Sequence, residues 1–206
     1  LTNRKIRSDS LDLEAWWLSS PDARGTVLYF GGNGFVKEIG YHIIFSILGQ
    51  DMNLLVFNYR GYGRNPGKPS IAGLKADGIA AYHHVRDSLN IAPEKLIIHG
   101  HSVGTFVATY VAARKDLAGL VLQSPITNAE DMTDALVPNL LKPLVNFELA
   151  QALKQENNLE EIQAVSEPLL VTCGTDDNIT PKAMAKSIHD HAPMEEKKLR
   201  LIKGGS

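Results

Sequence analysis

The chain has 206 residues, 21% of them charged, and a formal net charge of −2 at pH 7. That length suits one domain around a single core, and the charge gives no electrostatic footprint for nucleic acid or for an anionic membrane surface. The single cysteine excludes an internal disulfide framework, and no apolar run reaches the roughly 18 residues that span a bilayer.

Segments of strand and helix character alternate along most of the chain. This alternation predicts an α/β fold, with a mostly parallel sheet and helices on both of its faces. No repeat, low-complexity tract or linker interrupts it, so we expect one domain over residues 1–206. The expected strands, in chain order, are Glu14–Leu18, Thr26–Phe30, Asn53–Asn58, Lys95–Gly100, Gly119–Gln123, Pro168–Cys173 and Lys198–Lys203.

Three stretches between these strands have apolar residues at helical spacing. The first covers residues 36–48, and the second covers 71–89 with Ser70 as its N-cap. The third opens at Thr180 and Pro181, because proline is favoured at the first helical position. These helices would connect the strands in the order that a parallel sheet requires.

The alternation breaks between two strands, at approximately residues 125–166. This stretch holds three prolines, the acidic pair Glu130-Asp131 and amphipathic pieces such as Phe147–Leu153. Its length predicts a short cap of two or three helices inserted into the domain.

The most informative motif is Gly-His-Ser-Val-Gly at residues 100–104. It follows a strand-like run and precedes a helical pattern, which is the setting of a nucleophile elbow. The turn is so tight that its flanking residues must be small, and it holds Ser102 above the sheet beside the amides that begin a helix. A glycine-rich turn without catalytic function is the alternative, and the flanking strand and helix favour a nucleophilic serine.

Together with three other motifs, this elbow makes the chain resemble the α/β-hydrolase superfamily. The resemblance is to its small serine hydrolases, the serine-aminopeptidase-like or depalmitoylase-like branch, and it runs from about Leu13 to the last residue. The other motifs are Leu-Tyr-Phe-Gly-Gly-Asn-Gly at 28–34, Asn-Tyr-Arg-Gly-Tyr-Gly at 58–63 and Gly-Thr-Asp-Asp-Asn-Ile-Thr-Pro at 174–181.

A serine nucleophile needs a base that is itself oriented by a carboxylate, and in this fold the order along the chain is Ser, acid, His. Asp177 follows the predicted strand 168–173 and precedes a proline by four residues, which matches the pattern of the family. Asp176 is the competing acid, and its alternative role is to cap the turn before the next helix. We expect Asp177 to be the acid.

The resemblance implies a catalytic histidine after the last strand, directly behind a glycine-containing turn. Here that turn is residues 204–206, so we expect the base just beyond Ser206 and the 206-residue chain to be folded but inactive. His189 and His191 would lie on the order of 12–15 Å below the catalytic edge. The remaining histidines are expected in helices, in a strand or inside the elbow, so none of them is expected to be the base: His42, His83, His84, His99 and His101.

Two backbone amides are expected to form an oxyanion hole. One belongs to Val103, directly after the nucleophile, and the other to Asn33, with Gly34 second. Gly31 stands where the family commonly has histidine, which leaves open how this loop is braced. A glycine-rich turn with no catalytic function remains the alternative for the loop.

The motif at 58–63 resembles the loop that lies beside the pocket in the family. Tyr62 and Gly34 are the candidate pocket residues, and Arg60 is a candidate to hold a neighbouring loop through a salt bridge. Ordinary loop packing is an equal alternative for Arg60 and Tyr62. Cys173 ends an apolar run, so we expect a buried strand residue rather than a nucleophile.

These observations predict a serine hydrolase that cleaves a carboxylic ester, thioester or amide through an acyl-enzyme, with esters and thioesters favoured over peptides. We expect a small-molecule or acyl substrate, no metal, no organic cofactor and no nucleic acid. The alternative is a non-catalytic binding module on a hydrolase fold that lacks the base. The residue encoded after Ser206 discriminates between them, since histidine supports the enzyme.

Because the first residue is Leu1 and not methionine, we expect an upstream segment to have been removed. Membrane association is expected only through such a segment, as a signal peptide or anchor. Localisation therefore stays open between a cytoplasmic protein and a membrane-anchored or exported one.

Overall fold

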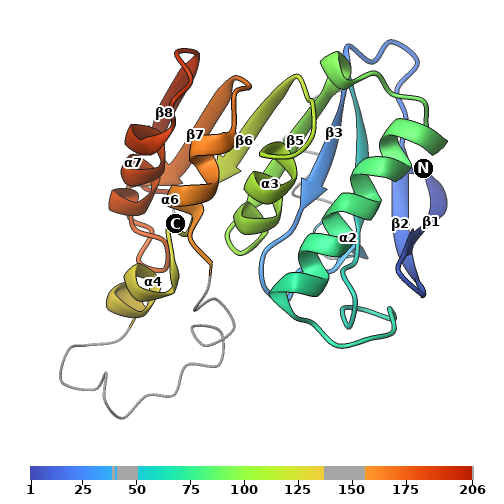
Figure 1. Cartoon of the computed structure of the whole chain (residues 1–206), viewed down its shortest axis with the longest axis horizontal. Coiled ribbons are helices and arrows are strands. Elements are labelled where there is room, and N and C mark those ends of the chain that lie inside the picture. Colours follow the sequence, from blue (N-terminus) through green and yellow to red (C-terminus); the bar gives the residue numbers. More distant parts are fainter. Residues whose placement is uncertain (39, 41–50, 137–155, 206) are drawn as a thin grey trace.

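The computed structural model describes residues 1–38, 40, 51–136 and 156–205. An eight-stranded sheet with the order β1-β2-β4-β3-β5-β6-β7-β8 runs through the whole of this part of the chain (Figure 1). Six neighbouring strands, from β4 to β8 in that order, are parallel, while β1 and β2 are antiparallel to their neighbours. The mostly parallel α/β sheet predicted from the sequence is thereby confirmed.

All seven predicted strands are present, with ends that differ from the prediction by at most three residues. The additional strand is β1, at the edge of the sheet, where it pairs with β2. The strands are β1 (Thr2–Ser8), β2 (Leu11–Leu18), β3 (Gly25–Phe30), β4 (Met52–Phe57), β5 (Leu96–His101), β6 (Gly119–Gln123), β7 (Leu169–Gly174) and β8 (Lys197–Ile202).

The helices begin where the sequence signals predict, with one shift. Ser70 caps α2, since its hydroxyl accepts a hydrogen bond from the Gly73 amide at 3.1 Å. Pro181 is the N-cap of α7 and not its first helical residue, because its ψ of 147° is still extended. The helices are α2 (Ile71–His83), α3 (Gly104–Ala112), α4 (Ala129–Leu136), α6 (Asn158–Glu161) and α7 (Lys182–His191).

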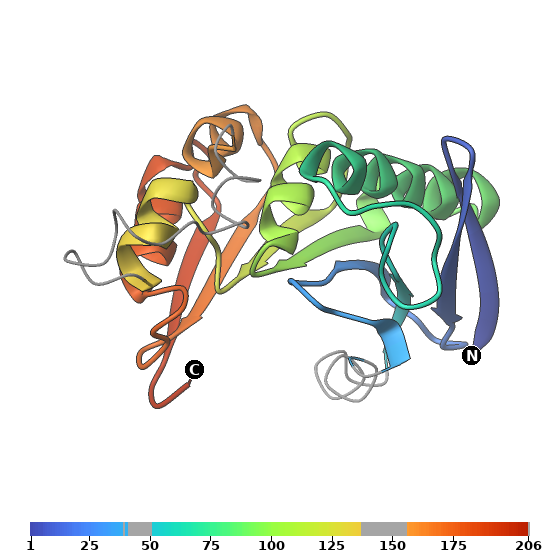
Figure 2. The same ribbon diagram turned by 90° about the horizontal axis from the view of Figure 1, so that it is seen from below.

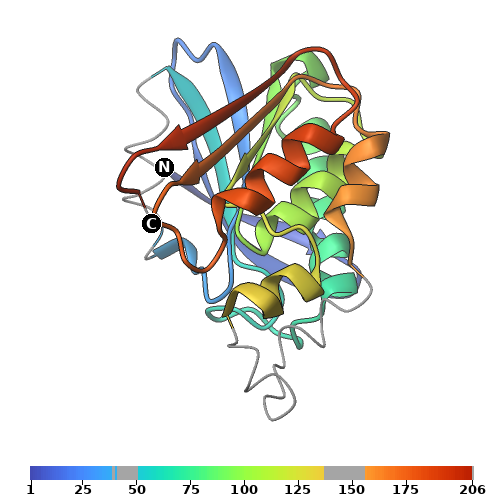
Figure 3. The same cartoon turned by 90° about the vertical axis from the view of Figure 1, so that its left-hand side faces the viewer.

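The helix predicted over 36–48 lies mostly outside the described residues. Its first turn is present, with the Gly40 amide bonded to the Val36 carbonyl at 3.0 Å. Helices α2, α3, α6 and α7 pack on one face of the sheet (Figures 1 and 3). The view in Figure 2 shows α2 and α3 side by side above the central strands. None of the helices in the described ranges is long and apolar enough to cross a membrane.

The main core lies between the sheet and these helices, and it includes fully buried Phe30, Leu55, Ile98 and Val107. A second cluster covers the other face around Tyr29 and Val56. Alternation of side chains along each strand assigns its residues to these two faces.

Of the predicted cap, the structure describes α4 and α6, whereas the amphipathic piece 147–153 lies outside the described residues. Helix α4 lies beyond the carboxyl ends of the central strands (Figure 1). Its Met132 packs in a small apolar cluster with Val103 and Phe106, which are the residues that lead into α3 and form its first turn. Helix α4 therefore lies directly beside the elbow.

The strand order locates the edge where a site is expected. From β3 the chain passes to β4 on one side, and it then returns to β5 on the other side of β3. The loops that leave the carboxyl ends of β3 and β5 therefore diverge. In open parallel sheets a crevice forms at such a switch point, and ligands bind there.

Candidate active site

Ser102 occupies a strained turn between β5 and α3. Its φ is +53°, in the left-handed region that residues with a Cβ rarely adopt. The Ser102 amide donates to the Gln123 carbonyl of β6 at 3.0 Å, and the Ser102 carbonyl accepts from the Thr105 amide at 2.9 Å. These bonds hold the residue in place on both sides, as expected for an elbow that presents its side chain at the sheet edge.

The two glycines of the motif are required by close contacts. A Cβ on Gly104 would lie 2.2 Å from the Phe30 carbonyl oxygen. A Cβ on Gly100 would lie 2.6 Å from Cβ of Ala108. Strand β3, strand β5 and helix α3 thus approach each other more closely than any side chain permits, and the predicted elbow geometry is present.

The loop after β3 lies against Ser102. A Cβ on Gly32 would lie 3.1 Å from Cβ of Ser102, so the loop passes directly beside that side chain. Asn33 and Gly34 follow, both exposed, and Gly34 has a φ of +70°. Among the described residues, neither the Asn33 amide nor the Val103 amide donates to a protein acceptor. The role of these two amides as an oxyanion hole stays a prediction.

Phe35 explains why this loop carries glycine where the family commonly has histidine. A Cβ on Gly31 would lie 2.2 Å from the Phe35 ring, and one on Gly40 would lie 1.9 Å from it. The Phe35 ring also packs on Tyr29, with the ring centroids 5.3 Å apart. The Phe35 ring fills the space that a larger side chain at position 31 would occupy, and it supports the loop by packing against it.

The loop after β4 supports the loop after β3 through two contacts. The Tyr62 hydroxyl donates to Asn33 Oδ1 at 3.1 Å. Buried Asn58 accepts a hydrogen bond from the Lys37 amide at 2.7 Å, and its own side-chain amide donates to Glu38 at 3.3 Å. Asn58 thus fixes the start of the segment that follows the candidate oxyanion loop. The expectation that Tyr62 and Gly34 line the substrate pocket stays a prediction.

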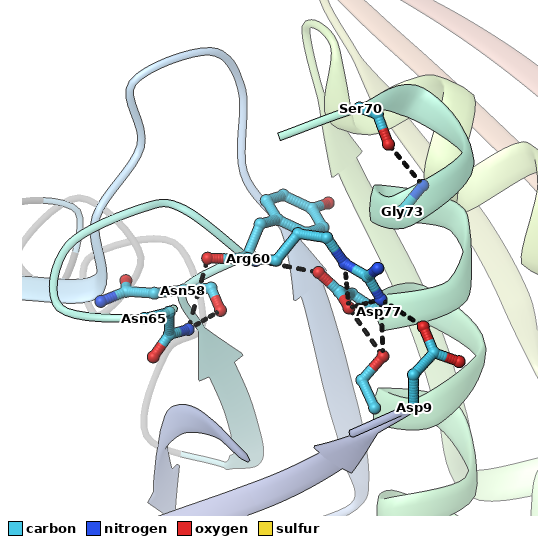
Figure 4. Close-up of polar contacts among 9 residues, drawn as sticks. Asp9, Asn58, Arg60, Asn65, Ser70, Gly73 and Asp77 are labelled. Atoms are coloured by element: carbon cyan, nitrogen blue, oxygen red, sulfur yellow. Dashed lines mark hydrogen bonds and ion pairs between the residues drawn. The ribbon is translucent and has the colours of Figure 1, made fainter. Parts of the chain in front are cut away.

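Arg60 anchors the loop after β4 to the rest of the molecule, which confirms the predicted salt bridge (Figure 4). Its guanidinium donates to fully buried Asp77 of α2 at 2.7 and 3.0 Å and to Asp9 at 2.9 Å. Asp77 also accepts from the Arg60 amide and from the Ser8 hydroxyl. The pKa of Arg60 is raised, mainly by its hydrogen bond with Asp77.

Asp177 lies in the loop between β7 and α7 with its carboxylate fully engaged. Oδ1 accepts from the amides of Ile179 and Thr180 at 2.9 and 2.8 Å. Oδ2 accepts from the Thr180 hydroxyl at 2.8 Å and from the Ser124 hydroxyl at 3.0 Å. Burial alone would raise the pKa of Asp177, but these hydrogen bonds outweigh it and lower that pKa. The carboxylate is therefore held ionised and in a fixed direction.

Asp176 has a different environment. Its side chain is exposed and accepts a hydrogen bond from the hydroxyl of Thr175 at 2.9 Å. Its backbone amide donates to the Gly205 carbonyl at 3.1 Å, and the Gly204 amide donates to the Thr175 hydroxyl at 3.0 Å. The turn that follows β8 is thereby fixed against the loop that carries Asp177.

No histidine in the described ranges is hydrogen-bonded to Ser102 or to the Asp177 carboxylate. His99 is buried and pairs with Gln123 at 3.1 Å, and burial lowers its pKa to about 4. Burial also lowers the pKa of His101, although the Asp177 charge opposes this. His189 and His191 lie in the last turn of α7.

The structure also places the cysteine that the sequence analysis considered. Cys173 is a free, buried strand residue whose thiol donates to the Thr180 carbonyl, and burial raises its pKa. This confirms the prediction of a buried strand cysteine. Across the described residues, no group of three or more His, Cys, Asp or Glu is arranged to hold a metal ion.

The structure thus collects Ser102, Val103 and the Asn33 loop at the switch point. It puts Asp177 two strands away, linked to that point through the end of β6. Ser124 was not singled out by the sequence, although it lies directly after a predicted strand. The sequence indicated Asn58 only as the first residue of the motif at 58–63.

Comparison with known proteins identifies the family of the chain. The sequence profile of the serine aminopeptidase S33 family matches residues 21–163. An uncharacterized protein of Mycobacterium tuberculosis is 31% identical over 182 residues, covering 87% of this chain and 63% of that protein. Alpha/beta hydrolase domain-containing protein 17B of Xenopus tropicalis is 33% identical over 163 residues, covering 78% of this chain and 52% of that protein. The chain belongs to the serine aminopeptidase S33 family, within the α/β-hydrolase superfamily.

Solved structures show the same fold. The Pyrococcus furiosus esterase Pf2001 superposes with a TM-score of 0.76 at 19% identity, covering 98% of this chain and 80% of that one. The monoacylglycerol lipase of Paleococcus ferrophilus superposes with a TM-score of 0.70 at 20% identity, covering 94% of this chain and 89% of that one. The chain spans about half to two thirds of the length of the curated relatives described above.

Proposed function

We propose that the protein is a serine hydrolase that cleaves a carboxylic ester or thioester through an acyl-enzyme intermediate. The observation that carries this proposal is the elbow: Ser102 at a φ of +53°, between two glycines that admit no side chain. Strained backbone at a sheet edge is typical of a residue held for chemistry. The names of structural neighbours, an esterase and a monoacylglycerol lipase, support an ester substrate over a peptide.

In the first step, Ser102 Oγ bonds to the acyl carbon while its proton passes to a base. The tetrahedral oxyanion accepts hydrogen bonds from the Val103 and Asn33 amides. The base then returns the proton to the departing alcohol or thiol as its bond to the acyl carbon breaks. Water attacks the acyl-enzyme in the same way, and it releases the carboxylic acid and restores Ser102. This sequence requires no metal or organic cofactor.

The proposed base is a histidine directly after Ser206. The turn after β8 supports this, because its Gly204 and Gly205 are bonded to Thr175 and Asp176, beside the proposed acid. A residue that follows this turn directly would emerge next to Asp177. Asp177 would orient the imidazole and stabilise its charged form.

The experiment compares two proteins, the chain 1–206 and the same chain extended by its native C-terminal residues. Both are assayed with p-nitrophenyl esters of increasing acyl length. We expect the extended protein to turn over esters and the 206-residue chain to be folded but almost inactive. Efficient turnover by the shorter chain would contradict the proposed position of the base. An inactive extended protein would favour a binding role instead.

Ser102→Ala in the extended protein tests the nucleophile. We expect kcat to fall by roughly 10³-fold or more, because the oxyanion hole and the binding surface remain while the acyl-enzyme cannot form. Ser166→Ala, which changes an exposed serine far from the elbow in sequence, is the matched control and should be unaffected. Near-wild-type turnover by Ser102→Ala would dismiss the elbow as the site of chemistry.

A further inference from the structure

Ser124 occupies an unusual position between the nucleophile and the candidate acid. It directly follows β6, whose last residue, Gln123, accepts the hydrogen bond from the Ser102 amide. The Ser124 amide donates to the Thr172 carbonyl of β7 at 2.8 Å. Its hydroxyl donates to Asp177 Oδ2 at 3.0 Å. One residue therefore joins the strand beside the elbow to the loop that carries the acid.

The backbone of Ser124 is strained. Its φ is +47°, and Pro125 follows it, which restricts the conformations open to it. Glycine adopts positive φ without steric conflict, whereas a residue with a Cβ is strained there. A glycine here would leave the turn intact but would supply no hydroxyl. The serine side chain therefore has a purpose that the turn alone does not explain.

The carboxylate of Asp177 identifies that purpose. Its donors are the amides of Ile179 and Thr180 and the hydroxyls of Thr180 and Ser124. Three of these donors belong to the acid's own loop, and Thr180 is buried. Ser124 is the donor that comes from outside that loop, directly after β6.

Among the described residues, no other ionisable group is hydrogen-bonded to this carboxylate. Cys173 lies in β7, before the loop that carries Asp177. Its thiol donates to the carbonyls of Thr180 and Gly174, and it also interacts with the Ser124 hydroxyl. His101 ends β5, and it interacts with Asp177 through charge, with no hydrogen bond to the carboxylate. The position of Asp177 Oδ2 thus depends on its hydrogen bonds with Ser124 and Thr180.

We propose that Ser124 is a positioning residue for the acid: its hydroxyl holds Oδ2 of Asp177 in a fixed direction. As a statement about catalysis this rests on the proposed function, in which Asp177 orients the imidazole of the base. The hydroxyl keeps the carboxylate ionised and directed toward that imidazole.

The first test needs no activity. The pKa of Asp177 is measured by ¹³C NMR titration of its carboxyl carbon in the wild type, Ser124→Ala and Ser124→Gly. Alanine retains the strained backbone and loses the hydroxyl, whereas glycine loses both. We expect the pKa of Asp177 to rise by a similar amount in both variants. An unchanged pKa in either folded variant would overturn the proposal, and Ser124→Gly is the variant expected to fold without strain.

The second test uses ester turnover by the C-terminally extended protein. We expect both variants to lower kcat by about tenfold, with KM changed less than twofold, since a hydrogen bond to a charged group contributes a factor of about ten or more. A wild-type kcat in Ser124→Gly would show that turnover does not need the Ser124 hydroxyl, and it would overturn the positioning role. If Ser102→Ala stays active while the NMR shift is present, the proposed function fails and the Ser124–Asp177 contact stands.

Discussion

The nucleophile elbow and the acid loop stand at the same edge of the sheet, but they are built in different ways. The elbow consists of five consecutive residues, and steric exclusion at Gly100 and Gly104 defines it. The acid loop is defined by hydrogen bonds that reach Asp177 from its own turn and from Ser124, 53 residues earlier in the chain. Local sterics leave a motif in the sequence, whereas a hydrogen bond across strands does not.

The largest effect that separates the two regions is expected at the acid. Asp177→Asn should lower kcat of the C-terminally extended protein by on the order of 10⁴, because an amide presents the wrong hydrogen-bond partner to the base. Asp176→Asn is the matched control, and its exposed side chain should make the change mild. Ester turnover under saturating substrate measures both. If Asp176→Asn is the damaging change, the acid is assigned one residue too late.

The elbow should respond in stability rather than in chemistry alone. Gly104→Ala places a Cβ 2.2 Å from the Phe30 carbonyl oxygen, so β3 and α3 must move apart. Overpacking of this kind costs about 1–3 kcal/mol, and a backbone neighbour puts it at the upper end. Gly119→Ala, whose nearest neighbour would lie at 3.3 Å, is the control. The free energy of unfolding of both variants is measured with urea. Equal values for Gly104→Ala and Gly119→Ala would contradict the steric account.

The strand under the elbow should show an effect on stability that appears only as the pH falls. The pKa of His99 is lowered by burial to about 4, so the folded state resists a proton that the unfolded chain accepts near pH 6.5. Stability from this group is complete above pH 6.5 and is lost as the pH falls toward 4. We expect the wild type to lose about 2–3 kcal/mol more than His99→Gln across this window.

Urea unfolding at several pH values measures this difference. His101 and His84, whose pKa values are also lowered by burial, are present in both proteins and cancel in the comparison. Parallel curves for the wild type and His99→Gln would mean that water reaches this strand, and that the elbow rests on a less rigid base than the contacts indicate.

Most of the fold could be predicted from the sequence because apolar strands alternate with helical patterns. Strand β1 was missed for a physical reason. Its residues Thr2–Ser8 are mostly polar and exposed, and only Ile6 and Ser8 are buried. An edge strand of this kind is held by pairing with β2 and leaves little hydrophobic periodicity. The predicted start of α7 was one residue too early, because the extended ψ of Pro181 makes it the N-cap.

The site was predictable to the extent that its residues form local motifs. The turn at Ser102 follows from its two glycines, and the position of Asp177 follows from its strand and proline. The contribution of Ser124 was not predictable, since it depends on a positive φ and on a partner in another loop. Gly31 stands in place of the family's histidine because the Phe35 ring fills the space of a side chain at position 31. The sequence alone does not reveal that contact.

One measurement tests the central claim most directly. The C-terminally extended protein is treated with a fluorophosphonate, which forms a covalent bond only with an activated serine, and the modified residue is located by peptide mass spectrometry. We predict one adduct, on Ser102, that is lost in Ser102→Ala and slowed strongly in Asp177→Asn. An adduct on another serine, or none on a protein that hydrolyses esters, would contradict the claim that Ser102 is the nucleophile.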